Sequence, residues 1–95
     1  MRRYRISPIA RADIKEIYRF VANDKPAAAG HLRAIFYEKF RLLAAQPLMG
    51  EVCDELAENL RRSFVGNYVI YYRPSGHGID VVRVLHGARD VDALF

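Results

Sequence analysis

The chain has 95 residues, of which 52% are hydrophobic and 12% aromatic, enough apolar side chains for one packed core and a single domain over residues 1–95. No stretch approaches the run of about 18 apolar residues that a membrane span needs, and no apolar segment follows the basic start as it would in a signal peptide. We therefore expect a soluble, cytoplasmic protein with no membrane association.

The net charge of +4 is unevenly distributed along the chain. Residues 1–48 carry ten Lys or Arg and four Asp or Glu, residues 49–58 carry four acids only, and residues 59–95 carry five Arg and three Asp. The three segments thus contribute +6, −4 and +2. A basic N-terminal half favours an acidic partner, either nucleic acid or an acidic protein segment, although a solvated surface accounts for the same charge.

Residues 3–7 are predicted to form a short strand, and a helix follows at once. Ser7 can cap free backbone amides, and Pro8 suits the first helical turn, where its missing N–H costs nothing. Apolar residues share one helical face and three basic residues share another. The apolar face consists of Ala10, Ile14, Ile17, Tyr18 and Val21, and the basic row of Arg11, Lys15 and Arg19.

The segment from Asn23 to Pro26 interrupts the first helix and starts a second, which is predicted to end near Gln46 because Pro47 disfavours helical angles in the residue before it. The result is an antiparallel pair of helices with a tight link. Its second helix has an apolar side made of Ala29, Leu32, Ile35, Phe36, Phe40 and Leu43. We expect His31 to have a surface or packing role, because no second metal ligand lies at a helical spacing from it.

From Leu60 onward the pattern changes to strands rich in aromatic and β-branched residues. Two strands, at 60–65 and 68–73, flank Gly66 and Asn67, which suit a two-residue hairpin turn. A second turn covers residues 74–78. The third strand, from Ile79 to Leu85, is almost continuously apolar, so we expect it to be central and covered on both faces. The predicted order is β-α-α-β-β-β in an α+β fold.

The chain has no phosphate-binding glycine loop, zinc-binding cysteine cluster or Ser/His/Asp set of recognisable spacing, so we expect neither metal nor cofactor. We expect Cys53 to be an unreactive thiol, since no cation flanks it. Arginines and aromatics on or after the strands remain as candidate binding residues, and they suit RNA contacts and protein interfaces equally. They are Arg61, Arg62, Tyr68, Tyr72, Arg83, His86 and Arg89.

Arg83 is the sharpest individual case among these residues. An arginine inside the apolar run Val81–Leu85 must either reach solvent at a groove or find an acidic partner within the fold. The sequence leaves both a contact role and an internal ion pair open.

The C-terminal half resembles the signature of ParE-type toxins, in the RelE/ParE superfamily of type II toxin–antitoxin systems. The resemblance lies in LRRSFVGNYVIYYR at residues 60–73 and VRVLHGARD at residues 82–90, and extends to IKEIY at 14–18 and PLMG at 47–50. It covers essentially the whole chain. The resemblance implies a helical hairpin packed on a small twisted antiparallel sheet, and neutralisation by a cognate antitoxin whose C-terminal segment wraps the toxin.

The resemblance leaves the target open, because RelE-like relatives cleave mRNA on the ribosome whereas ParE-like relatives poison DNA gyrase. RelE-like nucleases have a basic residue where this chain has Val69 and a terminal tyrosine where it has Phe95, and of that set only Arg89 is retained. RNA cleavage through the 2′-hydroxyl needs proton acceptors, donors and cations, which Val69 and Phe95 cannot supply. We therefore expect a growth-inhibiting gyrase binder, of the kind that stabilises plasmids, rather than an enzyme.

Two alternatives stay open. One is a ribosome-dependent mRNA endonuclease that uses Arg83, His86 and Arg89, and the other is an inactive toxin-like protein that only binds the antitoxin. The antitoxin is expected to form a hetero-oligomer with the chain, to link it indirectly to promoter DNA, and to place apolar side chains along both helices and the sheet edge, with its carboxylates against the basic charge. The expected contacts are Ile14, Ile17, Tyr18, Leu32 and Phe36.

Overall fold

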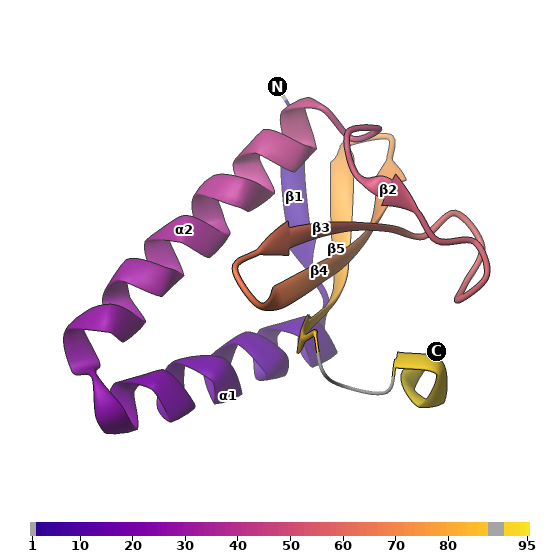
Figure 1. Cartoon of the computed structure of the whole chain (residues 1–95). Helices are drawn as coiled ribbons and strands as arrows, with labels where there is room; N and C mark the ends of the chain where they lie inside the picture. The colour runs from indigo at the N-terminus through magenta and orange to yellow at the C-terminus, as the bar shows by residue number, and fades with distance from the viewer. Residues whose placement is uncertain (1, 88–90) are drawn as a thin grey trace.

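The computed structural model describes residues 2–87 and 91–95 and confirms the expected α+β fold. Figure 1 shows two long helices joined as a V, with a twisted sheet lying across its opening. The elements in chain order are β1 (Arg3–Ile6), α1 (Pro8–Asp24), α2 (Pro26–Ala45), β2 (Glu51–Val52), β3 (Arg61–Val65), β4 (Tyr68–Ser75), β5 (Gly78–His86) and the short 3-10 helix η1 (Val91–Leu94).

Local signals set the helix ends as expected. The Ser7 side chain accepts a hydrogen bond of 3.0 Å from the backbone N–H of Ala10, which caps α1. Lys25 alone separates the helices, with φ −139° and ψ 88°, because Pro26 disfavours helical angles in the residue before it. Neither helix of the described chain has the length and apolar character that crossing a membrane requires.

The strands form one sheet in the order β1-β5-β4-β3-β2. Val65 pairs with Tyr68 across the predicted turn, where Gly66 has a φ of 55°, and Ser75 pairs with Gly78 across the next turn. As predicted, β5 has a partner strand on each side. Two features differ from expectation: β2 adds a fifth, two-residue strand, and β1 pairs with β5 in parallel rather than antiparallel.

The parallel pairing of β1 follows from the long connection through the helices, since parallel strands cannot be joined by a tight turn. Gly78 makes the pairing possible, because a Cβ there would overlap the Arg3 carbonyl and its φ of 143° is unfavourable for other residues. The pairing of β1 with β5 ends at Val81, next to a β-bulge in β5. The bulge is seen in the pairing with β4, where Tyr71 pairs with Arg83 but the next residue, Tyr72, pairs with Val81. Beyond the last strand pair, the Ser7 hydroxyl continues the contact with β5 by donating a hydrogen bond of 3.0 Å to the Val82 carbonyl.

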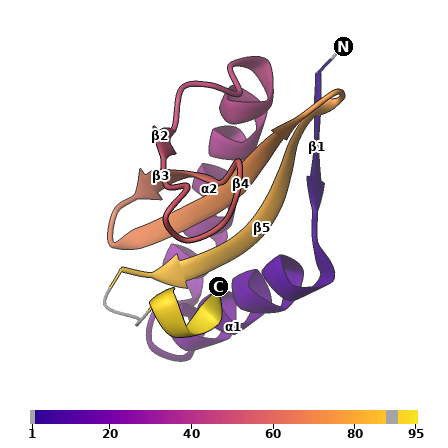
Figure 2. The same cartoon turned by 90° about the vertical axis from the view of Figure 1, so that its right-hand side faces the viewer.

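The sheet separates two apolar clusters. The larger, beneath the helices, includes Phe36, Phe40, Leu43, Ile70 and Tyr72. The smaller, on the opposite face, is covered by the loop after β2 and by the C-terminal segment: it comprises Cys53, Leu60, Val69, Tyr71 and Leu85, with Phe95 packed against it. Figure 2 shows η1 in front of the sheet and the helices behind it. Alternation along β4 assigns its side chains to the two clusters in turn.

Candidate partner-binding site

An open groove lies between α2 and the β3–β4 hairpin. Its volume is about 520 Å³, and it is lined by Leu32, Ile35, Glu38, Lys39, Leu42, Phe64, Val65, Gly66, Asn67, Tyr68 and His86. Large apolar side chains are exposed along both walls: Ile35 by 37%, Leu42 by 43% and Phe64 by 52%. Since burial of such side chains is favourable, a bound partner that covered this groove would be stabilised by it, and we call it the α2 groove.

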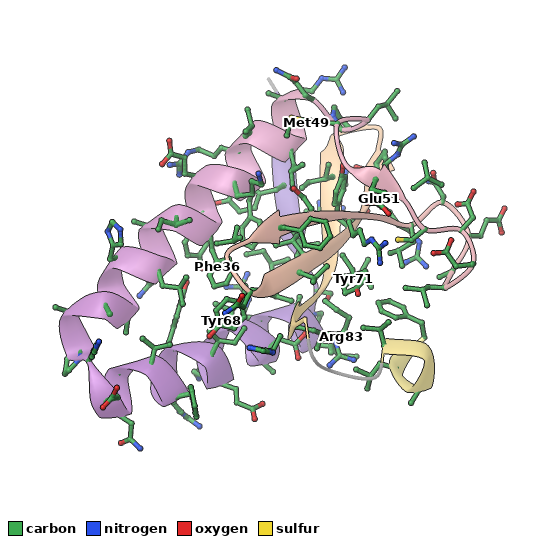
Figure 3. All side chains as sticks on the ribbon, in the orientation of Figure 1. Phe36, Met49, Glu51, Tyr68, Tyr71 and Arg83 are labelled. Atoms are coloured by element: carbon green, nitrogen blue, oxygen red, sulfur yellow. The ribbon has the colours of Figure 1, made fainter. Side chains whose placement is uncertain are left out.

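A second, smaller hollow of about 270 Å³ adjoins α1 and the end of β5. Phe20 lines it and is 78% exposed, the largest exposure of any large apolar side chain described. Tyr68 and His86 line both this hollow and the α2 groove, so the two form neighbouring parts of one surface. Figure 3 shows Tyr68 within the opening of the V, beside Phe36, and the two rings meet edge to face at 5.7 Å.

His86 is exposed, and its ring lies 5.6 Å from that of Tyr68 in a T-shaped arrangement. It also lines a hollow of about 420 Å³ on the other face of the sheet, with Arg62, Phe64 and Tyr71. His86 thus stands at the junction of three hollows. Of the expected binding residues, the structure brings Tyr68 and His86 together at the α2 groove. Arg62 lines only the hollow on the other face of the sheet.

Arg83 has the internal partner that its position in β5 allowed. Its Nε and one terminal nitrogen donate to the two carboxylate oxygens of Asp13 at 2.8 and 3.0 Å, and the side chains are only 16% and 11% exposed. The hydrogen bond with Asp13 raises the pKa of Arg83, so the guanidinium stays charged. The internal ion pair that the sequence left open is therefore present and engages Nε and one terminal nitrogen of Arg83, and a contact or catalytic role for this residue stays a prediction.

Arg61 and Tyr72 anchor the loop that follows α2. The Arg61 guanidinium donates to the carbonyls of Leu48 and Gly50 at 3.0 and 2.8 Å. The Tyr72 hydroxyl donates to the Pro47 carbonyl and accepts from the Gly50 N–H, both at 2.8 Å. Tyr72 is fully buried and Arg61 is half-buried, and both hold this loop in place. Their expected roles as binding residues stay predictions.

Arg62 stays near the surface but is paired. It donates to Glu51 at 2.7 Å, and its guanidinium lies 5.9 Å from the centre of the Phe64 ring. The hydrogen bond with Glu51 raises the pKa of Arg62. Because its side chain is 30% exposed, Arg62 can still contribute to a contact surface. Arg89 lies outside the described residues.

The five expected antitoxin contacts divide into two groups. Ile14 and Phe36 are 3% and 0% exposed core residues, so neither presents a surface to a partner in this structure, and their antitoxin contacts stay predictions. The apolar face of each helix is used to cover the sheet, which a helical wheel cannot distinguish from a free face. Ile17, Tyr18 and Leu32 are half-buried at the edge of the core and remain predicted contacts.

The exposed apolar residues Phe20, Ile35, Leu42 and Phe64 define the surface better than the predicted set. The sequence pattern places Ile35 on the apolar side of the second helix and does not single out the other three. A signal for Phe20 and Leu42 does exist in the sequence, because each lies beside the main apolar stripe of its helix rather than on it.

Two of the positions that distinguish RelE-like nucleases pack against the smaller cluster here. Val69 is 7% exposed in the smaller cluster, and Phe95 lies 5.1 Å from Tyr71 between ring centres. Among the described residues no three His, Cys, Asp or Glu side chains gather as a metal site. Cys53 is fully buried, and burial raises the pKa of its thiol, which disfavours the reactive thiolate.

The fold and these surfaces define a small α+β domain with an open apolar groove suited to receiving a partner. Residues 4–91 match the sequence family described as the ParE toxin of the type II toxin–antitoxin system parDE, and the chain belongs to this family. It is 39% identical to Toxin ParE1 of Mycobacterium tuberculosis over 93 residues, which cover 95% of this chain and 94% of that protein.

One further relative and one solved structure are also similar to this chain. Toxin ParE1 of Caulobacter vibrioides is 30% identical over 95 residues, covering 98% of this chain and 97% of the relative. A solved structure described as the chromosomal ParDE TA system from P. aeruginosa superposes with a TM-score of 0.76 at 18% identity, covering 90% of this chain and 96% of that one. The structural likeness supports the fold.

Proposed function

We propose that the chain inhibits DNA gyrase and is neutralised by a cognate antitoxin that occupies the α2 groove. Membership in the ParE toxin family supports the proposal as a whole. The observation that carries the antitoxin part is the row of exposed apolar side chains, Ile35, Leu42 and Phe64, around a groove of about 520 Å³. Such a groove suits the apolar face of an amphipathic segment.

The antitoxin part is tested by substitutions at the groove walls. Leu42→Asn and Phe64→Asn should each weaken binding of the cognate antitoxin by about fivefold or more, since truncation of a central apolar anchor costs about 1 kcal/mol or more. Leu48→Asn is the matched control, because Leu48 is 69% exposed but does not line the groove. Binding is measured by titration calorimetry. Equal affinities for all three variants and the native chain would exclude the groove.

The gyrase part is tested with the purified chain and purified gyrase. The expected results are loss of DNA supercoiling, accumulation of gyrase-linked DNA breaks, and reversal of both by equimolar antitoxin. Supercoiling that proceeds normally with soluble, folded chain would overturn gyrase inhibition. Growth arrest on expression, relieved by the antitoxin, would then show a toxin with another target, and unimpaired growth would favour an inactive antitoxin-binding protein.

A ribosome-dependent mRNA endonuclease remains the second candidate, because His86 is exposed where three hollows meet. Histidine can accept a proton near neutral pH. However, Arg83 is paired with Asp13, so one of the cations expected for that chemistry is already occupied. Codon-positioned mRNA cleavage on ribosomes without any effect on gyrase would establish this second function in place of the first.

A further inference from the structure

A basic and aromatic surface covers part of the helical hairpin next to β1. It consists of two adjoining hollows of about 500 and 580 Å³ that share Arg11 and Tyr37. Their charged lining residues are all cations, Arg5, Arg11, Lys15 and Arg33, and their aromatic lining residues are Tyr4, Tyr18 and Tyr37. Among the residues that the structure describes, no Asp or Glu lines either hollow. We call this set the basic–aromatic surface.

The acidic residues of the helices lie elsewhere. Asp13 and Glu16 line the hollow beside Phe20, and Glu38 lines the α2 groove. Among the described residues, the salt bridges join Arg62 to Glu51, His77 to Asp80 and Arg83 to Asp13, so none involves a cation of the basic–aromatic surface. The charged lining of these two hollows is therefore entirely positive and takes part in none of these salt bridges, although Lys39, another cation of the helices, lines the α2 groove.

Arg33 lies over two aromatic rings on this surface. Its guanidinium carbon lies 5.8 Å from the ring centres of both Tyr18 and Tyr37, within the range of a cation–π contact. Arg33 itself is exposed. A planar guanidinium that is supported by two rings keeps its donors available for a phosphate and presents a face on which a base can stack.

We propose that the basic–aromatic surface binds the phosphodiester backbone of a nucleic acid, without the help of the antitoxin. The inference goes beyond gyrase inhibition, because it assigns a direct nucleic-acid contact to the toxin chain itself. A nucleic acid carries a negative charge on every nucleotide, and its binding to Lys and Arg is driven by counterion release. Stacking of unpaired bases on tyrosine and arginine adds to this attraction.

An acidic peptide fits the surface less well. Exposed ion pairs contribute only about 0 to 1 kcal/mol each, so a peptide depends on apolar anchors. The exposed large apolar side chains Ile35, Leu42 and Phe64 line the α2 groove, and none of the residues that line the two basic hollows is among the exposed large apolar ones. The exposed large apolar side chains of the α2 groove and the cations of the two basic hollows thus belong to different parts of the hairpin surface, although Tyr18, a predicted antitoxin contact, lines one of the basic hollows.

The test measures binding of fluorescent single-stranded and duplex oligonucleotides to the full chain by anisotropy over a range of salt concentrations. We expect dissociation constants of about 10⁻⁴ to 10⁻⁶ M near physiological salt, with affinity falling as salt rises. The double variant Arg11→Gln with Lys15→Gln should reduce the slope of log K against log salt by about 1.4 for single strands and about 1.8 for duplex. Lys25→Gln, which removes an exposed cation outside both hollows, should leave it unchanged.

A second variant separates charge from stacking. Arg33→Lys keeps the charge and loses the planar group, so it should keep the salt slope while weakening single-strand binding more than duplex binding. Polyglutamate is the competing probe. The proposal is overturned if polyglutamate binds and the oligonucleotides do not, if neither binds, or if the double variant binds oligonucleotides with the native slope while circular dichroism shows it folded.

Discussion

Asp13 joins α1 to β5 through three hydrogen bonds. Its carboxylate accepts two from the Arg83 guanidinium, at 2.8 and 3.0 Å, and one from the Val84 N–H at 3.1 Å. The last of these satisfies a backbone donor of β5 beyond the end of its pairing with β1. One side chain therefore completes the edge of the central strand and neutralises the arginine next to the β-bulge. Figure 3 shows Arg83 at the end of β5 that faces α1.

Replacement of Asp13 by Asn should destabilise the fold by about 3 kcal/mol or more, because it leaves a largely buried guanidinium without its counter-charge. The measurement is urea unfolding followed by circular dichroism. The control is Glu51→Gln, which removes the partner of Arg62 at a pair whose side chains are 30% and 58% exposed. The control should lose at most about 1 kcal/mol. If both variants lost the same small amount, the Asp13–Arg83 pair would not stabilise the fold.

Tyr72→Phe should destabilise the protein by about 1 to 3 kcal/mol, since it removes a buried hydroxyl that serves both the Pro47 carbonyl and the Gly50 N–H. The loss should be accompanied by faster hydrogen exchange at the Gly50 amide. Gly50→Ala should be at least as harmful, because a Cβ at that position would overlap the Tyr72 hydroxyl and the Arg62 carbonyl. Native exchange at Gly50 in the Tyr72→Phe variant would contradict the anchoring role.

Tyr18→Phe should have the opposite sign and leave stability unchanged or slightly increased. The Tyr18 hydroxyl is buried and has no hydrogen-bond partner among the described residues, so its removal relieves an unsatisfied group. It is the matched tyrosine control for Tyr72→Phe in the same denaturation experiment. A loss as large as that of Tyr72→Phe would show that the hydroxyl has a partner in solution.

The dependence of stability on pH provides an independent test of the burial of the Tyr18 hydroxyl. Burial, reinforced by Tyr37, raises the pKa of Tyr18 from 10.0 to about 12, so the folded state holds this proton more tightly than the unfolded state. Ionisation of Tyr18 therefore leaves stability unaffected below pH 10.0 and lowers it as the pH rises from 10.0 towards about 12, where the unfolded state loses this proton first. Tyr18→Phe should flatten the fall in stability over this range. Unchanged pH dependence in the variant would contradict the raised pKa.

His86→Gln distinguishes the two proposed targets. If the chain binds gyrase, most of the toxicity should survive, because no proton transfer is lost. If it cleaves mRNA, the rate should fall by about 10² to 10⁴, the contribution of a general base. Paired assays of gyrase-linked DNA breaks and ribosomal mRNA cleavage, on native chain and variant, decide between them. Loss of mRNA cleavage with no gyrase effect in either protein would reject our proposal.

The sequence by itself determined the local elements and the family. The helix start at Ser7, the break before Pro26 and the hairpin turn at Gly66 depend on residues a few positions apart, so their patterns predicted the structure correctly. The α+β class followed from the order of these elements. The motifs at residues 60–73 and 82–90 indicated the ParE toxins, and the family match over residues 4–91 agrees.

Only the tertiary structure decided which side chains are free to bind. Arg83 pairs with Asp13, which lies 70 positions earlier, and Tyr72 reaches a loop about 25 positions away. Ile14 and Phe36 are buried while Phe20 and Leu42 are exposed, although all four are apolar residues of helices. The exposure and the pairing of a side chain depend on which surfaces of the helices pack against the sheet. That packing arises from contacts between segments distant in the chain, which a periodic pattern does not encode.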